Sequence, residues 1–371
     1  MNKLSYFLNV CNNIRASEMN AKISFINNKL PDFDRVKELL DLAAKENMFA
    51  NRGPLYRILA DKFADHFRLD STTTITPCAN AGIALEGMAR LLASQTGRNL
   101  KWVGSAFSFQ NLGRGYFWDM DFVDCTEQGL LDLDSLKRIP KENYDGIILV
   151  NPLGIHDNFE KYINFARETN KFLLLDNAAG SCRKIPDWPW QAFSLHHTKP
   201  YGMGEGGLAL TPTNVADELY ALLNYGEVPN NPKNWLNNGK ISDISCAFLI
   251  QRLEKYSEWC PLYLKQADRI QKIMEGVGLS PLLPLAPDTP AMSLPYLAQN
   301  SIPPENLAKA QKLTFGKYYK PLVNFPAVSD IYSKIFNIPT HPDMALVSDD
   351  EIINDVLTIA QPHGCQGIGI E

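Results

Sequence analysis

Short apolar runs, each bounded by polar residues, recur along the first half of the chain. They cover residues 72–77, 102–104, 121–124, 146–150 and 171–176. Helical patterns lie between several of these runs, at 79–92 and 157–169. Runs of this length that alternate with helices are typical of βαβ units, which build a mostly parallel and buried sheet. The sequence therefore predicts an α/β fold in which helices flank the sheet.

The length and a change in composition predict two domains. The chain has 371 residues, of which 45% are hydrophobic, enough for a sizeable core. Helical patterns fill 32–67, a Gly- and Pro-containing stretch follows near 226–235, and one long helix is expected over 243–275. We predict a large domain over 1–225, with an N-terminal segment that can pack on the second domain, and a small α+β domain over 226–371.

Charge and cysteine usage exclude several classes of protein. Thirty-six Lys and Arg against 41 Asp and Glu give a net charge of −5 without a basic block, which argues against nucleic-acid binding. The longest apolar stretches are too short to span a membrane, and the N-terminus carries no signal-like apolar run. Seven scattered cysteines without a CxxC pair fit a reducing compartment. We expect a cytoplasmic protein.

Two segments carry residues that could take part in catalysis or bind a ligand. Asp176 follows the apolar run 172–175, so it is expected at the end of a buried strand, where open α/β sheets bind ligands. Lys199 lies five residues after Ser194, before a glycine-rich turn. This combination suits pyridoxal 5′-phosphate (PLP), since a lysine amine forms a Schiff base with the aldehyde and a carboxylate pairs with the ring nitrogen. Ser194 and backbone amides can hold the phosphate.

Simpler interpretations apply to each residue taken alone. Asp176 could be a helix N-cap, and an isolated lysine such as Lys199 is usually a solvated surface residue. The spacing Gly202-x-Gly204-x-x-Gly207 matches a dinucleotide fingerprint, but the following residues 208–211 have a strand pattern instead of a helical one. His196 and His197 are adjacent and lack further ligands at metal spacing, so we predict no metal site.

The chain resembles the PLP-dependent nucleotide-sugar aminotransferases of the DegT type, within the fold-type-I, aspartate aminotransferase-like superfamily. The resemblance covers most of the chain. Its most specific motifs are LLDNAA at 174–179, SLHHTK at 194–199 and GEGG at 204–207. Similar stretches are NRGP at 51–54, residues 74–85 and 107–109, YYKPL at 318–322 and IPTHP at 338–342. The resemblance implies a seven-stranded type of mostly parallel sheet with a smaller C-terminal α+β domain.

The resemblance also implies roles for individual residues. Lys199 would form the Schiff base with PLP and move the proton, Asp176 would bind the ring nitrogen, and Ser194 would bind the phosphate. Phe109, with Phe107 as the alternative, would stack on the ring. Asn238 matches a position that reaches the phosphate of the neighbouring subunit, which implies a homodimer with shared active sites.

Three positions depart from the family pattern. A Ser-Gly-Thr phosphate turn is replaced by Asn80, Ala81 and Gly82, so backbone amides at the helix N-terminus must carry more of that contact. A Gln or His near the phenolic oxygen is replaced by Gly180, for which Asn151 is a candidate substitute. An arginine is replaced by Lys240. Predicted substrate-binding residues are Asn51, Gly53, Lys240, His197 and Tyr319.

The activity implied by the resemblance is a ping-pong transamination. L-glutamate would load the cofactor as pyridoxamine phosphate, and a nucleotide-linked keto-sugar would take the amino group, as in amino-sugar and polysaccharide biosynthesis. A sugar dehydratase or lyase on the same fold is an alternative, although relatives that dehydrate tend to have histidine in place of the lysine retained here as Lys199. A non-catalytic PLP- or sugar-binding regulator is a third hypothesis. The nucleotide, the keto position and even the sugar nature of the acceptor stay open.

Overall fold

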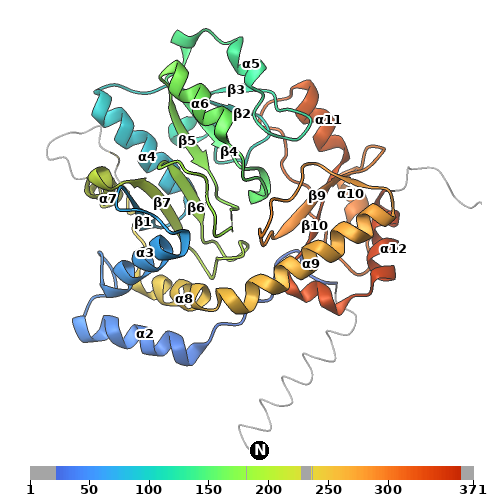
Figure 1. Cartoon of the computed structure of the whole chain (residues 1–371), viewed down its shortest axis with the longest axis horizontal. Helices are drawn as coiled ribbons and strands as arrows, with labels where there is room; N and C mark the ends of the chain where they lie inside the picture. The colour runs from blue at the N-terminus through green and yellow to red at the C-terminus, as the bar shows by residue number, and fades with distance from the viewer. Residues whose placement is uncertain (1–21, 181, 227–234, 236, 361–371) are drawn as a thin grey trace, which may run out of the picture.

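A seven-stranded sheet forms the centre of the computed structural model, which describes residues 22–180, 182–226, 235 and 237–360 (Figure 1). The strand order is β1-β7-β6-β5-β4-β2-β3, and β7 runs antiparallel to both of its neighbours while the other pairs are parallel. This confirms the predicted mostly parallel sheet. The strands are β1 (Thr73–Cys78), β2 (Trp102–Ser105), β3 (Asp121–Val123), β4 (Gly146–Val150), β5 (Phe172–Asp176), β6 (Gln191–Ser194) and β7 (Gly207–Pro212).

Both faces of the sheet are buried. In β4, Ile147 and Leu149 join one apolar core, whereas Ile148 and Val150 join another on the opposite face. This division follows from the period of two along a strand. Because both faces are covered, the central strands need apolar residues at every position, which explains the continuous runs in the sequence.

Helices cover the two faces in separate groups. On one face α4 (Ala81–Thr96) and α7 (Ala216–Leu223) pack together. On the other, α2 (Phe33–Glu46), α3 (Pro54–Phe67) and α8 (Asp243–Glu254) share a core with β1, β6 and β7, and α6 (Glu160–Thr169) packs beside β4 and β5. The short α5 (Leu133–Lys137) belongs to the same core as α6.

The helix expected over 243–275 is divided in two. α8 ends at Glu254, and α9 (Tyr256–Gly276) begins after Lys255. The side chain of Trp259 intervenes at this point, since its indole N–H donates to the Arg252 carbonyl at 2.9 Å. A side-chain donor that takes a helix carbonyl is a usual cause of such a break.

The C-terminal region contains a small antiparallel sheet. Its order is β10-β9-β8, with β8 (Ser280–Pro281), β9 (Ser293–Leu297) and β10 (Ile335–Pro339). It is accompanied by α10 (Pro304–Leu307), α11 (Pro326–Lys334) and α12 (Asp349–Ala360). α8 and α9 follow one another from the large sheet to the small one (Figure 1). This region shares a continuous apolar core with one face of the large sheet.

The first described residues lie against the C-terminal region. Ile23 pairs with Leu313 in a parallel bridge, and Asn27 and Asn28 donate to the Asp343 carboxylate at 2.9 and 2.7 Å. The predicted division of the chain at 225/226 falls beside residues 227–234, which are outside the described residues. That division stays a prediction.

Candidate active site

The predicted cofactor residues gather at one edge of the large sheet. Every strand except β7 runs in the same direction, so the carboxyl ends of the others meet there. Residues that follow or end these strands are Asn80 (β1), Phe109 (β2), Asn151 (β4), Asp176 (β5) and Ser194 (β6). The fold therefore brings together residues spread over more than a hundred positions of sequence.

Asp176 is a buried carboxylate at the end of β5, with 4% of its surface exposed. Its Oδ1 accepts a hydrogen bond from the Ala178 N–H at 3.1 Å. Burial raises the pKa of Asp176 to about 6, while the Ala178 N–H and the charge of Lys199 act in the opposite direction. A cationic group placed against this carboxylate would offset the cost of burying its charge.

Lys199 lies in the turn that joins β6 to β7. Burial lowers the pKa of its amine, and the Asp176 carboxylate partly opposes this shift. The Lys199 Nζ contacts Met292 Sδ at 3.8 Å, so the C-terminal region also reaches the site, just before β9. Sequence reasoning missed Met292, because an isolated methionine in a proline-containing stretch carries no functional signal.

The start of α4 offers free backbone donors. The Asn80 side chain caps the helix, its Oδ1 accepting from the Ile83 N–H at 2.9 Å. Among the described residues, the N–H groups of Ala81 and Gly82 meet no protein acceptor, as is usual in a first helical turn. A Cβ at Gly207 would lie 2.3 Å from the Asn80 carbonyl carbon, so only glycine permits this close approach of β7 to α4.

Ser194 lies near the start of α4, because its partner across the sheet, Gly207, packs against Asn80. It is paired with Gly207 across β6 and β7, and its Oγ accepts a hydrogen bond from the His196 N–H at 3.2 Å. The hydroxyl proton of Ser194 is then available for an acceptor such as a phosphate oxygen. Together with the free N–H groups of α4, it makes this corner suited to an anion.

Phe109 and Phe107 have different surroundings. Phe109 is 51% exposed, whereas Phe107 is fully buried and packs edge-on against Tyr319, with the ring centroids 5.3 Å apart. The Tyr319 hydroxyl accepts from the Leu153 N–H at 3.2 Å, and burial raises its pKa, with a smaller contribution from Asp176. Of the two phenylalanines, Phe109 is thus the one with a face available to a ligand.

The side chain of Asn151 is engaged within the protein. Its Nδ2 donates to the His156 carbonyl at 2.9 Å and to Asn177 Oδ1 at 2.8 Å, and its Oδ1 accepts from the His156 N–H at 3.1 Å. These bonds hold the loop after β4 against the loop after β5. The predicted contact of Asn151 with the cofactor stays a prediction.

Three of the predicted substrate residues form a separate group. Lys240 Nζ donates to Asn51 Oδ1 at 2.7 Å, and a Cβ at Gly53 would collide with the buried Asp243 carboxylate, 2.4 Å from Oδ2. Asn238 lies next to this group, in a bridge with Asn224. The following carbonyl, that of Gly239, accepts from the Ala79 N–H at 2.8 Å, which places the segment beside the start of α4. Of the other two predicted substrate residues, His197 is part of the turn that carries Lys199, and Tyr319 packs against Phe107.

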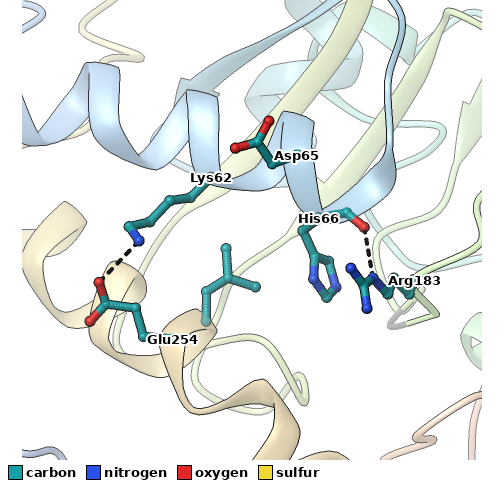
Figure 2. A pocket seen from close by; sticks show the side chains of 6 residues that line it. Lys62, Asp65, His66, Arg183 and Glu254 are labelled. Atoms are coloured by element: carbon teal, nitrogen blue, oxygen red, sulfur yellow. Dashed lines mark hydrogen bonds and ion pairs between the residues drawn. The ribbon is translucent and has the colours of Figure 1, made fainter.

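A hollow lies near that turn but outside the predicted site. It measures about 270 Å³ and is lined by Lys62, Asp65, His66, Arg183, Leu253 and Glu254 (Figure 2). Lys62 pairs with Glu254 at 3.1 Å, and Arg183 Nε donates to the His66 carbonyl. The ring of His66 is hydrogen-bonded to Tyr201 at 2.7 Å, which connects this hollow with the turn.

Among the described residues, neither a cluster of metal ligands nor a membrane-spanning helix is present. No group of three or more His, Cys, Asp or Glu side chains lies close enough together to hold a metal ion. No helix in that part of the chain has the length and apolarity needed to cross a membrane.

Comparison with known proteins identifies the class of protein. The model of the DegT/DnrJ/EryC1/StrS aminotransferase family matches residues 33–357. Protein Mb3436c of Mycobacterium bovis is 25% identical over 253 residues, which are 62% of this chain and 60% of that protein. The chain thus covers 60% of the length of this curated relative.

Solved structures show the same fold. A DegT DnrJ EryC1 StrS aminotransferase from Brucella abortus has a TM-score of 0.73 at 18% identity, covering 89% of this chain and 96% of that one. DesI, solved in the presence of its TDP-sugar product, has a TM-score of 0.72 at 18% identity, covering 92% of this chain and 93% of that one.

The chain belongs to the DegT/DnrJ/EryC1/StrS aminotransferase family. This confirms the resemblance found in the sequence, and with it PLP as the cofactor. The site fits that group. A buried carboxylate at Asp176 can face a protonated ring nitrogen, and the free N–H groups of Ala81 and Gly82 can face a phosphate.

Proposed function

We propose that this chain catalyses PLP-dependent transfer of an amino group from L-glutamate to a nucleotide-linked keto-sugar. The observation that carries the proposal is the buried carboxylate of Asp176 at the carboxyl edge of the sheet, close enough to the desolvated Lys199 amine for their charges to interact. The TDP-sugar product of DesI supports a nucleotide sugar as the acceptor class. The amino donor is inferred from the resemblance alone.

When bound, PLP supplies an aldehyde that condenses with amines and a ring that accepts the electrons of a carbanion. Lys199 would hold the cofactor through its uncharged amine, and burial favours that uncharged form. The same amine would also move the proton that transamination shifts between two carbon atoms.

The other residues bind and orient. The negative charge of Asp176 would keep a proton on the ring nitrogen, and burial would strengthen that attraction. Ala81, Gly82 and Ser194 would donate hydrogen bonds to the phosphate, and Phe109 would cover one face of the ring. Asn151 holds the loop after β4 against the loop after β5 through its hydrogen bonds with His156 and Asn177.

A half-reaction with glutamate tests the activity. Adding L-glutamate to the PLP-loaded protein should replace the visible absorbance of the cofactor with that of its amine form and release 2-oxoglutarate. A panel of nucleotide keto-sugars should then restore the visible absorbance and yield an amino sugar. A deoxy sugar without an amine would indicate a dehydratase, and binding without turnover would indicate a regulator. Either result overturns the proposal.

We also propose a cytoplasmic homodimer in which Asn238 of each subunit reaches the phosphate of the other. Support for the compartment is that all five described cysteines are free thiols. Mixing Lys199→Ala subunits with Asn238→Ala subunits tests the shared site. Hybrid dimers contain one site with both residues intact, so activity should rise on mixing. No rise would contradict the exchange of Asn238.

A further inference from the structure

The turn at residues 196–202, here called the Lys199 turn, is bonded to a buried lysine from the N-terminal segment. Lys29 Nζ donates to the carbonyls of His197 at 2.6 Å and Gly202 at 2.8 Å, and also to the carbonyl of Lys199 itself. The Lys29 residue is 8% exposed. One side chain thus bonds three backbone oxygens around the proposed cofactor lysine.

A second buried cation contacts the same turn from α8. Arg252 Nε donates to the Pro200 carbonyl at 2.9 Å, and Arg252 is 9% exposed. Its guanidinium lies 4.2 Å from the centre of the Trp259 ring, which fixes its plane. We refer to Lys29 and Arg252 together as the turn clamp.

The turn needs these donors because three of the four carbonyls that the turn clamp contacts, those of His197, Pro200 and Gly202, accept no backbone hydrogen bond within the turn. Within it, the Lys199 N–H donates to His196 and the Gly202 N–H donates to Lys199, both at 2.8 Å. The carbonyls that contact the turn clamp point into the protein, where an unpaired acceptor is costly. Three oxygens around one nitrogen require three N–H donors, which a lysine has only as an ammonium ion.

Burying the two cations of the turn clamp costs free energy. Burial, together with the nearby charges of Arg252 and Lys199, lowers the pKa of Lys29 to about 6, and the three carbonyl acceptors oppose this shift because they bond the ammonium form. In the described part of the chain, neither cation of the clamp forms an ion pair with a carboxylate. Buried charges without a counter-charge are retained mainly where a specific geometry is needed.

The segment that carries Lys29 is itself anchored. Asn27 donates to Asp343 at 2.9 Å and accepts from the Tyr263 hydroxyl at 3.1 Å. Asp343 belongs to the C-terminal region and Tyr263 to α9. The clamp therefore ties the Lys199 turn to α9 and to the C-terminal region.

We propose that Lys29 and Arg252 are positioning residues that hold the Lys199 turn, so that the Lys199 amine stays desolvated beside Asp176. The proposal rests on Lys199 being the lysine that binds the cofactor. It predicts that the turn, and not the sheet, loosens first when the clamp is removed.

Hydrogen exchange of the PLP-loaded full chain tests this. Lys29→Met removes the donors at nearly unchanged length, and backbone amides in 196–204 should exchange on the order of tenfold faster or more. Lys171→Met is the matched control, since Lys171 Nζ also bonds two carbonyls, of Lys141 and Tyr144, away from the turn. Unchanged exchange at 196–204, or equal acceleration in β4 and β5, overturns the proposal.

A pH titration provides a readout that loss of packing alone would not move. With a looser turn, water reaches Lys199 and favours its protonated form, so the midpoint of the pH-dependent cofactor absorbance should rise, by about 0.5 pH unit or more. Lys29→Arg should return it most of the way, and Lys171→Met should leave it in place. No rise in Lys29→Met overturns the proposal. If Lys199→Ala keeps the visible absorbance, the role of Lys199 fails, while the exchange result stands by itself.

Discussion

Asp176 and Asp355 are both buried carboxylates, in two regions with different demands. Asp355, on α12, accepts from the N–H groups of Gln311, Lys312 and Leu313 at 2.7 to 2.8 Å. Asp176, at the carboxyl edge of the large sheet, accepts one backbone N–H among the described residues and lies within electrostatic reach of Lys199. The first charge is satisfied by its own fold, whereas the second needs a partner that the fold does not supply.

This difference separates the C-terminal region, which is built for stability, from the sheet edge, which is built for a ligand. A buried group that is fully hydrogen-bonded stabilises the native state. A buried group that is short of partners lowers stability, and proteins keep such groups where chemistry requires them. Mutations at the two places should therefore affect different observables.

The largest expected effect is at Lys199. Lys199→Ala removes the amine that binds the cofactor and moves the proton, so transfer activity should fall by a factor of about 1,000 or more. The visible absorbance of the bound cofactor should disappear, and thermal unfolding should change little. A variant that keeps both absorbance and turnover would show that the sheet edge is not the site.

The two phenylalanines after β2 extend the comparison. Phe107→Ala leaves a cavity in the core shared with the C-terminal region and should lower the free energy of unfolding by about 3–5 kcal/mol. Phe109→Ala, at an exposed position, should leave stability nearly unchanged and weaken cofactor binding. Denaturant unfolding and cofactor titration of both variants distinguish these effects. The reverse pattern would move the stacking role to Phe107.

In the cofactor-free protein, the buried charge of Asp176 should lower the free energy of unfolding. The pKa of this carboxyl rises from 3.8 to about 6 on folding, so the folded state binds more protons between these values. The free energy of unfolding should then decrease as pH rises from 4 to 6, by up to about 3 kcal/mol. Asp176→Asn should remove this dependence. Identical pH profiles for both proteins would mean that Asp176 is not under strain.

Asp355→Asn should lower stability without affecting the cofactor, and its effect should be smaller. Its amide nitrogen would face backbone N–H donors, so stability should fall by about 2 kcal/mol. Cofactor absorbance and turnover should stay at the level of the unaltered protein once the variant is folded. Thermal unfolding followed with and without cofactor checks this. A loss of cofactor binding would contradict the assignment of Asp355 to stability alone.

Much of the fold was predictable because local patterns agree with it. Runs such as 146–150 must be buried on both faces, and only a covered parallel sheet does this. β6 was not anticipated, since Gln191–Ser194 is short and mixed in polarity and becomes a strand through its pairing with β5 and β7. The single helix over 243–275 was wrong, because the Trp259 indole takes a helix carbonyl.

The candidate site divides in the same way. Asp176 and Lys199 could be found from the sequence, because both patterns are local: a carboxylate follows an apolar run, and a lysine precedes a glycine-rich turn. The engagement of Asn151 with His156 and Asn177 could not, because it depends on how two loops meet.

The sequence by itself determined the alternation of strands and helices, the family, and the two residues on which the chemistry depends. Only the tertiary structure decided that Lys29 and Arg252, separated by more than two hundred positions, lie on the same turn, and that Met292 contacts Lys199. The reason is that local patterns record what each segment must bury. Which distant donor meets which carbonyl is fixed only when the segments pack together.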